Sequence, residues 1–222
     1  MLYIGNSLIG TATGATGQDT PILVRTLASA AGRTVRTTEV IHFGNTLQQT
    51  YDGGEVTPAL SGATKYDYIV LQEYSTLVAT NPSAARATLL NTYAPTFTST
   101  LKTGGKVVLF KNWALRDPAP FASRAAAVTA INTNYAALSA ALATPNVVAP
   151  ISDEFENVIA TKGPSYLIVA DGKHPNDTAI YLDAVTLYGI LFHDSPRALS
   201  DQYLSAATAA SMREVAATQI GY

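Results

Sequence analysis

The chain contains no cysteine among its 222 residues. This absence excludes disulfide bonds, thiol nucleophiles and metal sites built from thiolates. It leaves the redox compartment open, because a chain without thiols suits oxidising and reducing surroundings equally. Any covalent catalysis would have to use other side chains.

Charged residues are also scarce. Lys and Arg number 14, Asp and Glu number 16, and the formal net charge is -2. There is no basic run, so we expect no nucleic-acid partner and no basic surface for binding membranes. Uncharged polar side chains are abundant, which suits a neutral substrate without identifying one.

Long apolar runs are missing as well. None reaches the length of a membrane-spanning helix, so we expect no membrane span. Met1 leads directly into a strand-like apolar run, so we expect no signal peptide in this chain. The Thr-rich, Lys-poor composition still favours a periplasmic or secreted protein, and it gives no indication of the oligomeric state.

The apolar residues that are present, 47% of the chain, can bury a sizeable core, and the length fits one domain covering residues 1–222. The predicted strands cover residues 2–4, 34–43, 66–72, 106–110 and 147–151. The predicted helices cover residues 19–31, 46–51, 81–102, 120–142, 155–160, 174–192 and 205–219. The strands are apolar throughout instead of alternating, which is typical of a parallel sheet covered on both faces. We therefore predict a three-layer α/β/α domain with about five strands.

A hydroxyl side chain stands at the carboxyl end of the first predicted strand. Gly5 and Asn6 tolerate a sharp turn, and Ser7 follows them. In open α/β sheets, ligands bind at this end of the strands. A lone Ser in such a turn usually just bonds to the backbone, so a catalytic role for Ser7 requires partners elsewhere in the chain.

A serine nucleophile needs a base that takes its proton and a third group that orients the base. The chain has only three histidines, His42, His174 and His193. His193 lies near the end of a predicted helix, where we expect a surface residue that caps it. His42 stands beside a turn and could either line a cleft or have a structural role.

The third histidine, His174, has the setting that best suits a base. It precedes Pro175, a favoured first residue of a helix, so the predicted helix would hold its loop rigidly. Asp171 lies three residues earlier, close enough for its carboxylate to reach the imidazole Nδ1. The alternative is a helix N-terminus with a solvated aspartate and a surface histidine, and this string alone does not decide between the two.

Taken together, Gly5-Asn6-Ser7-Leu8 and Asp171-x-x-His174-Pro175 resemble motifs of the SGNH (GDSL-type) hydrolase superfamily. The resemblance implies a flavodoxin-like α/β/α fold and a triad of Ser7, His174 and Asp171, with no metal or organic cofactor. A second family block supplies a glycine whose backbone amide helps to form the oxyanion hole, and Gly44 matches it. Each motif is short, so the specificity comes from their combination and their order.

The chain departs from the family pattern in two places. Asn6 replaces the usual Asp of the first block, and the third block, normally Gly-x-Asn-Asp, is absent. The third predicted strand is followed instead by Gln72. Some carbohydrate-acetyl-esterase branches of the superfamily carry a Gln there, so the resemblance implies Gln72 as a side-chain donor in the oxyanion hole beside the amides of Ser7 and Gly44.

The identity of this side-chain donor stays open at this point. Glu73 is less suitable than Gln72, because an ionised carboxylate has no proton to donate. Asn45 is a further candidate, and Gln72 would then be a structural residue at the end of a strand.

The resemblance implies an esterase in which Ser7 attacks an ester carbonyl, His174 acts as base and then acid, and Asp171 orients the imidazole. The Gln-containing block and the uncharged polar composition favour a small acyl group, such as acetyl, on a sugar or glycan. Alternatives with the same fold are a lipase, a lysophospholipase and a thioesterase. A non-catalytic glycan-binding module is the alternative from another class, and the presence of all three triad residues argues against it.

Overall fold

A computed structural model of the chain describes residues 1–222, which fall into two compact units. The sheet unit comprises Met1–Leu8 and Thr38–Val148, and the helical unit comprises Ile9–Thr37 and Ala149–Tyr222. Each unit is therefore built from separate stretches of sequence. The expectation of a single domain over residues 1–222 stays a prediction.

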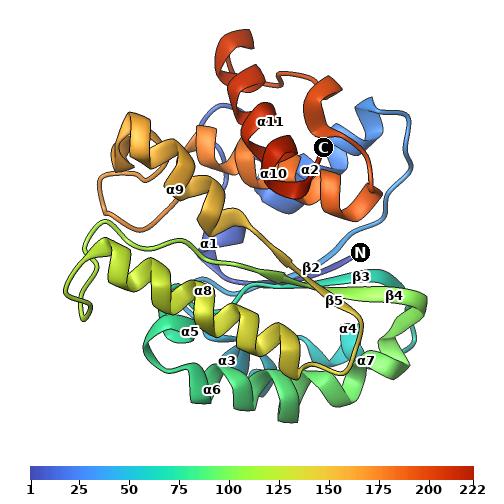
Figure 1. Cartoon of the computed structure of the whole chain (residues 1–222). Coiled ribbons are helices and arrows are strands. Elements are labelled where there is room, and N and C mark those ends of the chain that lie inside the picture. Colours follow the sequence, from blue (N-terminus) through green and yellow to red (C-terminus); the bar gives the residue numbers. More distant parts are fainter. The chain divides into compact units, whose positions relative to one another are not determined.

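The sheet has the strand order β2-β1-β3-β4-β5 (Figure 1). Its strands are β1 (Leu2–Gly5), β2 (Thr38–Ile41), β3 (Tyr66–Leu71), β4 (Leu101–Phe110) and β5 (Asn146–Ala149). β1 pairs in parallel with β2 and β3, and β3 pairs in parallel with β4. This is the flavodoxin-like order, in which ligands bind at the carboxyl ends of the strands, where the strand order reverses. The predicted fold class is confirmed.

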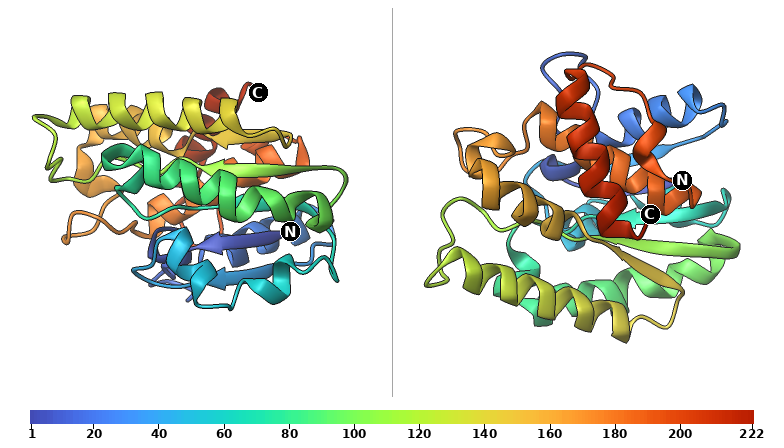
Figure 2. Two further views of the ribbon diagram at one scale, coloured as in Figure 1. Left: turned by 90° about the horizontal axis from the view of Figure 1, so that it is seen from below. Right: turned by 45° about the horizontal axis from the view of Figure 1, so that its top comes forward.

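The helices of the sheet unit lie on one face of the sheet (Figure 1). They are α3 (Leu47–Asp52), α4 (Thr57–Leu60), α5 (Leu77–Thr80), α6 (Pro82–Ala87), the π-helix η1 (Thr88–Tyr93), α7 (Ala94–Thr100) and α8 (Arg124–Ala141). Figure 2 shows α8 side by side with the continuous helical stretch formed by α6, η1 and α7.

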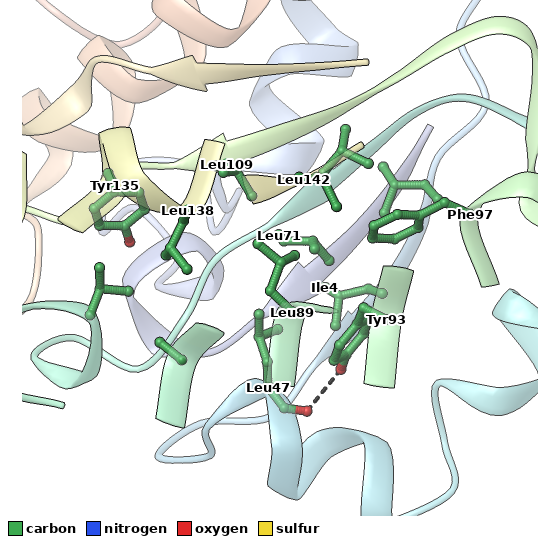
Figure 3. Packing of buried hydrophobic residues seen from close by; sticks show 14 of the residues in the cluster. Ile4, Leu47, Leu71, Leu89, Tyr93, Phe97, Leu109, Tyr135, Leu138 and Leu142 are labelled. Carbon is green, nitrogen blue, oxygen red and sulfur yellow. Dashed lines mark hydrogen bonds between the residues drawn. The ribbon is translucent and has the colours of Figure 1, made fainter. Parts of the chain in front are cut away.

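An apolar core fills the space between these helices and the sheet (Figure 3). Its members include Ile4, Leu71, Leu89, Leu109, Leu138 and Leu142. The hydroxyl of Tyr93 at its edge is satisfied, because it donates to the carbonyl of Leu47 at 2.8 Å (Figure 3). Tyr3 and Val70, which alternate with core residues along β1 and β3, are fully buried too. This explains why the strand sequences are apolar throughout.

The helical unit is organised around α10 (Asp177–Phe192), most of whose side chains are buried. α10 packs against α2 (Thr20–Ala30), α9 (Ile151–Lys162) and α11 (Ala206–Ile220). Two 3₁₀ turns, η2 (Pro164–Tyr166) and η3 (Pro196–Ala198), complete this unit. No helix of the structure is both long enough and apolar enough to cross a membrane.

The predicted boundary between the helix over residues 81–102 and the following strand was wrong. The helix passes through Pro95 by way of the π-helix and ends early, because Leu101 already pairs with Tyr66 in β4. Gly104 and Gly105, which follow the predicted end of the helix, lie within this strand at a shift in register. Gly104 has a φ of 80°, which other residues rarely adopt, and this allows the strand to continue.

Two other predicted strands were too long. β2 is confined to Thr38–Ile41, the part that pairs with β1. β5 ends at Ala149, because Ile151 already begins α9.

Candidate active site

Ser7 directly follows the turn at the end of β1 and is the first residue of the short helix α1 (Ser7–Gly10). Asn6 shapes this turn, since its Oδ1 accepts the N–H of Leu8 at 3.2 Å. Its Nδ2 donates to the carbonyl of Asn45 at 3.0 Å. An aspartate could not donate this second bond, so the departure from the usual family residue has a structural reason.

The loop after β2 is thus held against the turn that carries Ser7. The N–H of His42 donates to the carbonyl of Gly5 at 3.0 Å, next to the bond between Asn6 and Asn45. Gly44 lies between these two anchors with a φ of 84°, a conformation that favours glycine. Its N–H finds no acceptor within the protein. Gly44 therefore lies near the turn that carries Ser7, and its backbone amide can bind an anion.

The other two histidines have structural surroundings. His42 Nε2 lies 2.5 Å from Glu55 Oε2, which ties the ring to the exposed surface. His193 caps the end of α10 with a φ of 50°, as the sequence predicts. In His42 the carboxylate contacts Nε2, whereas the carboxylate of a serine-hydrolase triad contacts Nδ1.

Asp171 and His174 form a close pair in the helical unit. Asp171 Oδ2 lies 2.5 Å from His174 Nδ1. Asp171 Oδ1 accepts the backbone N–H groups of Lys173, at 2.8 Å, and of His174, at 3.0 Å. Desolvation opposes ionisation of this carboxyl, but the hydrogen bonds from the ring and the two amides outweigh it and lower the pKa of Asp171 to about 2. The carboxylate is therefore charged at neutral pH and able to orient the imidazole.

The loop of this pair is supported differently from what the sequence predicts. α10 begins at Asp177 and is capped by Asn176, so His174 and Pro175 precede the helix instead of opening it. Pro175 forms an antiparallel bridge with Ile168, and the carbonyl of His174 accepts the N–H of Val169 at 3.0 Å. The stronger local signal is the side-chain cap, which outweighs the preference of proline for the first turn.

Asp177 is the neighbouring carboxylate that could have replaced Asp171. Its two oxygens accept the N–H groups of Gly14 at 2.8 Å and Ala15 at 3.1 Å. It thereby fixes the Gly- and Thr-rich loop after α1. The carboxylate that lies against the imidazole is Asp171.

Gln72 follows β3 and is fully buried. Its Oε1 accepts the N–H of Asn6 at 2.8 Å. Its Nε2 donates to Asn112 Oδ1 at 3.1 Å and to the carbonyl of Glu73. Both amide hydrogens are thus engaged within the protein, and this geometry does not favour the expected role of Gln72 as an oxyanion donor.

The two other candidate donors differ in their surroundings. Glu73 is buried, and its Oε1 accepts the N–H groups of Leu47 at 2.9 Å and Tyr74 at 2.7 Å. Burial raises the pKa of Glu73 in spite of these two bonds. The side chain of Asn45 makes no hydrogen bond within the protein, while its carbonyl is held by Asn6. Of Gln72, Glu73 and Asn45, only Asn45 therefore has a side-chain N–H donor that makes no hydrogen bond within the protein.

Sequence reasoning missed Asn112. It stands two residues after β4, is almost fully buried, and donates to the carbonyls of Glu73 at 2.7 Å and Tyr74 at 3.3 Å. The signal was the same as for Asn6 and Gln72: an amide side chain just beyond an apolar strand.

No group of three or more His, Asp and Glu side chains is arranged to hold a metal ion.

No family model matches the chain, and no curated protein matches its sequence. Solved structures do match. A DUF4886 family protein from Bacteroides uniformis aligns with a TM-score of 0.78 at 18% identity, covering 100% of this chain and 94% of its own. A candidate SGNH hydrolase from Slackia heliotrinireducens gives 0.64 at 22% identity, with 84% and 95% covered.

A third similar structure is Axe2, an acetylxylan esterase from Geobacillus stearothermophilus. It aligns with a TM-score of 0.60 at 16% identity, covering 84% of this chain and 92% of its own. Together with the strand order, these matches show that the chain has the fold of the SGNH hydrolases, as the sequence motifs predict.

Proposed function

We propose that this protein is a serine ester hydrolase that works through an acyl-enzyme. The observation that carries the proposal is the 2.5 Å contact between Asp171 Oδ2 and His174 Nδ1. With Nδ1 bound to a carboxylate, Nε2 is the ring nitrogen that can accept a proton. Ser7, at the end of β1 in a fold shared with esterases, is the hydroxyl whose proton it would take.

The proposed reaction has two halves. Ser7 Oγ attacks the ester carbonyl carbon while His174 takes the hydroxyl proton, and the resulting oxyanion is stabilised by the backbone amides of Ser7 and Gly44. The intermediate then expels the alcohol, which receives the proton from His174, and leaves the acyl group on Ser7. Water, deprotonated by His174, then attacks the acyl-enzyme, and the second intermediate releases the acid while His174 returns the proton to Ser7 Oγ. Asp171 stays ionised throughout and stabilises the imidazolium.

For the substrate, we propose a small acyl group, such as acetyl, on a carbohydrate. An acetylxylan esterase is among the similar structures. Phe43, beside Gly44, is 64% exposed on a loop that is fixed at both sides, and such an exposed aromatic ring can pack against the apolar face of a sugar. The low charge of the chain fits a neutral substrate.

Hydrolysis of p-nitrophenyl esters of increasing chain length, measured beside the release of acetate from acetylated xylo-oligosaccharides, tests this proposal. We expect kcat/KM to be highest for acetyl and to fall with chain length, and Ser7→Ala to abolish turnover of every ester. Preference for long acyl chains would favour a lipase instead. Wild-type rates equal to those of Ser7→Ala would remove the enzymatic proposal and leave a binding module.

A further inference from the structure

Three buried amide side chains stand at the carboxyl ends of three adjacent strands. Asn6 follows β1, Gln72 follows β3 and Asn112 follows β4, and each is at most 2% exposed. Because the strands are parallel and neighbouring, their carboxyl ends meet at the same edge of the sheet. This edge carries Ser7.

Hydrogen bonds join the three amides into a chain that ends at the backbone of the Ser7 turn. Asn112 is fixed by its donation to the carbonyls of Glu73 and Tyr74. Its Oδ1 accepts from Gln72 Nε2 at 3.1 Å, which orients the Gln72 amide so that Oε1 accepts the N–H of Asn6 at 2.8 Å. Asn6 is the residue before Ser7, so this last bond sets the backbone from which the serine projects.

We propose that Gln72 and Asn112 are positioning residues for the nucleophile, and that the Gln72 amide does not donate to the oxyanion. The inference rests on the proposed esterase activity. Its physical basis is that the N–H of Asn6 is a donor that only an acceptor oxygen can satisfy, so the Gln72 amide must present Oε1 to it and NH₂ to Asn112. A buried network whose members are all satisfied is rigid, and rigidity at Ser7 is what nucleophilic attack requires.

The two possible roles of Gln72 give opposite results for Asn112→Leu. If Gln72 positions the turn, removing Asn112 disturbs Gln72 and lowers kcat, although Asn112 itself touches no substrate. If Gln72 instead donated to the oxyanion, Asn112→Leu would free one of its amide hydrogens and leave kcat intact. Gln72→Met lowers kcat in either case, by about 10²–10³-fold for a lost oxyanion donor.

The experiment measures kcat and KM for p-nitrophenyl acetate in Asn112→Leu, Gln72→Met and the double variant, with Asn112→Ala in reserve if the leucine variant does not fold. Thr100→Val is the matched control, because Thr100 is a buried polar residue of the same unit whose hydroxyl donates to the carbonyl of Leu60 at 3.1 Å, far along the strands from Ser7. All assays are run well below each variant's melting temperature.

We expect Asn112→Leu to lower kcat about tenfold to a hundredfold with KM changed less than about threefold, as for a misplaced nucleophile. The double variant should be no worse than the worse single variant, because both act through the same bond, and Thr100→Val should keep the wild-type kcat. Unchanged kcat in Asn112→Leu, or an equal loss in Thr100→Val, would overturn the inference. Inactive wild type would instead refute the esterase proposal itself, so the two failures are distinguishable.

Discussion

At the scale of single residues, Asp171 and His174 are expected to act as one unit. Asp171 accepts from the imidazole and has no other route to the reaction. We therefore expect His174→Ala and the double variant with Asp171→Ala to retain the same residual kcat, because removal of the base already removes what Asp171 contributes. Steady-state kinetics with p-nitrophenyl acetate measures this.

Asp67→Asn is a suitable control for that experiment. Asp67 is also an exposed, paired carboxylate, 2.9 Å from Lys102, but it lies at the opposite end of the sheet from the strand ends that carry Ser7. It should leave kcat unchanged. If the fold-decrease in kcat of the double variant equals the product of the decreases in the two single variants, Asp171 and His174 do not act as one unit.

The sequence predicts the residues of the candidate site, but it does not show the hydrogen bonds that fix some of them. Ser7, Asp171 and His174 stand in short local patterns that a reader can recognise. The bonds of Gln72 depend on Asn6 and Asn112, which are 66 and 40 residues away in the sequence. No local pattern shows that both hydrogens of an amide are already engaged.

At the scale of elements, α10 contains a carboxyl group that the fold keeps neutral. Asp183 is fully buried, and neither of its oxygens has a hydrogen-bond partner. Burial raises the pKa of Asp183 well above its usual value, and the nearby carboxyl of Glu154 on α9 raises it further. The carboxyl of Asp183 therefore keeps its proton in the folded protein at pH values where it would release that proton in the unfolded chain.

This gives a prediction for stability. Between the ordinary pKa of an aspartate and the raised pKa of Asp183, the native state binds more protons than the unfolded state, so the free energy of unfolding falls as the pH rises. Each unit by which the pKa in the native state exceeds the pKa in the unfolded state corresponds to about 1.4 kcal/mol in the free energy of unfolding. The side chain of Asp183→Asn cannot ionise. The free energy of unfolding of this variant minus that of wild type should therefore increase from pH 4 to pH 7.

Urea unfolding of both proteins at the two pH values measures this difference. Glu154 and Tyr203, the neighbouring titratable groups, are the same in both proteins and so largely cancel. A stability difference that does not change with pH would show that Asp183 is ionised in the folded protein.

Element ends were predictable where a local cap decides them. The side chains of Asp19 and Ser205 accept from the first turns of α2 and α11, close to where the sequence places these helices. The start of β4 was not predictable in this way. Leu101 becomes strand because Tyr66 is beside it in the folded sheet, whereas the local pattern continues the helix to residue 102.

At the scale of the whole molecule, each compact unit carries one of the two sequence motifs. Ser7 belongs to the sheet unit, and Asp171 and His174 belong to the helical unit. The chain order of the two motifs and the parallel sheet were predictable, because both follow from patterns that run through the entire sequence. The substrate depends on side chains of loops, which have no periodic pattern in the sequence, so the sequence leaves several ester classes open.

The central claim is that Ser7 is a nucleophile activated by His174. The most direct measurement is the rate and position of labelling by a fluorophosphonate probe, read by peptide mass mapping in wild type and in His174→Ala. We predict a single label at Ser7 in wild type and a rate at least about a hundredfold lower in His174→Ala, the usual contribution of a general base. A label on another residue, or equal rates at Ser7 in both proteins, would contradict the account.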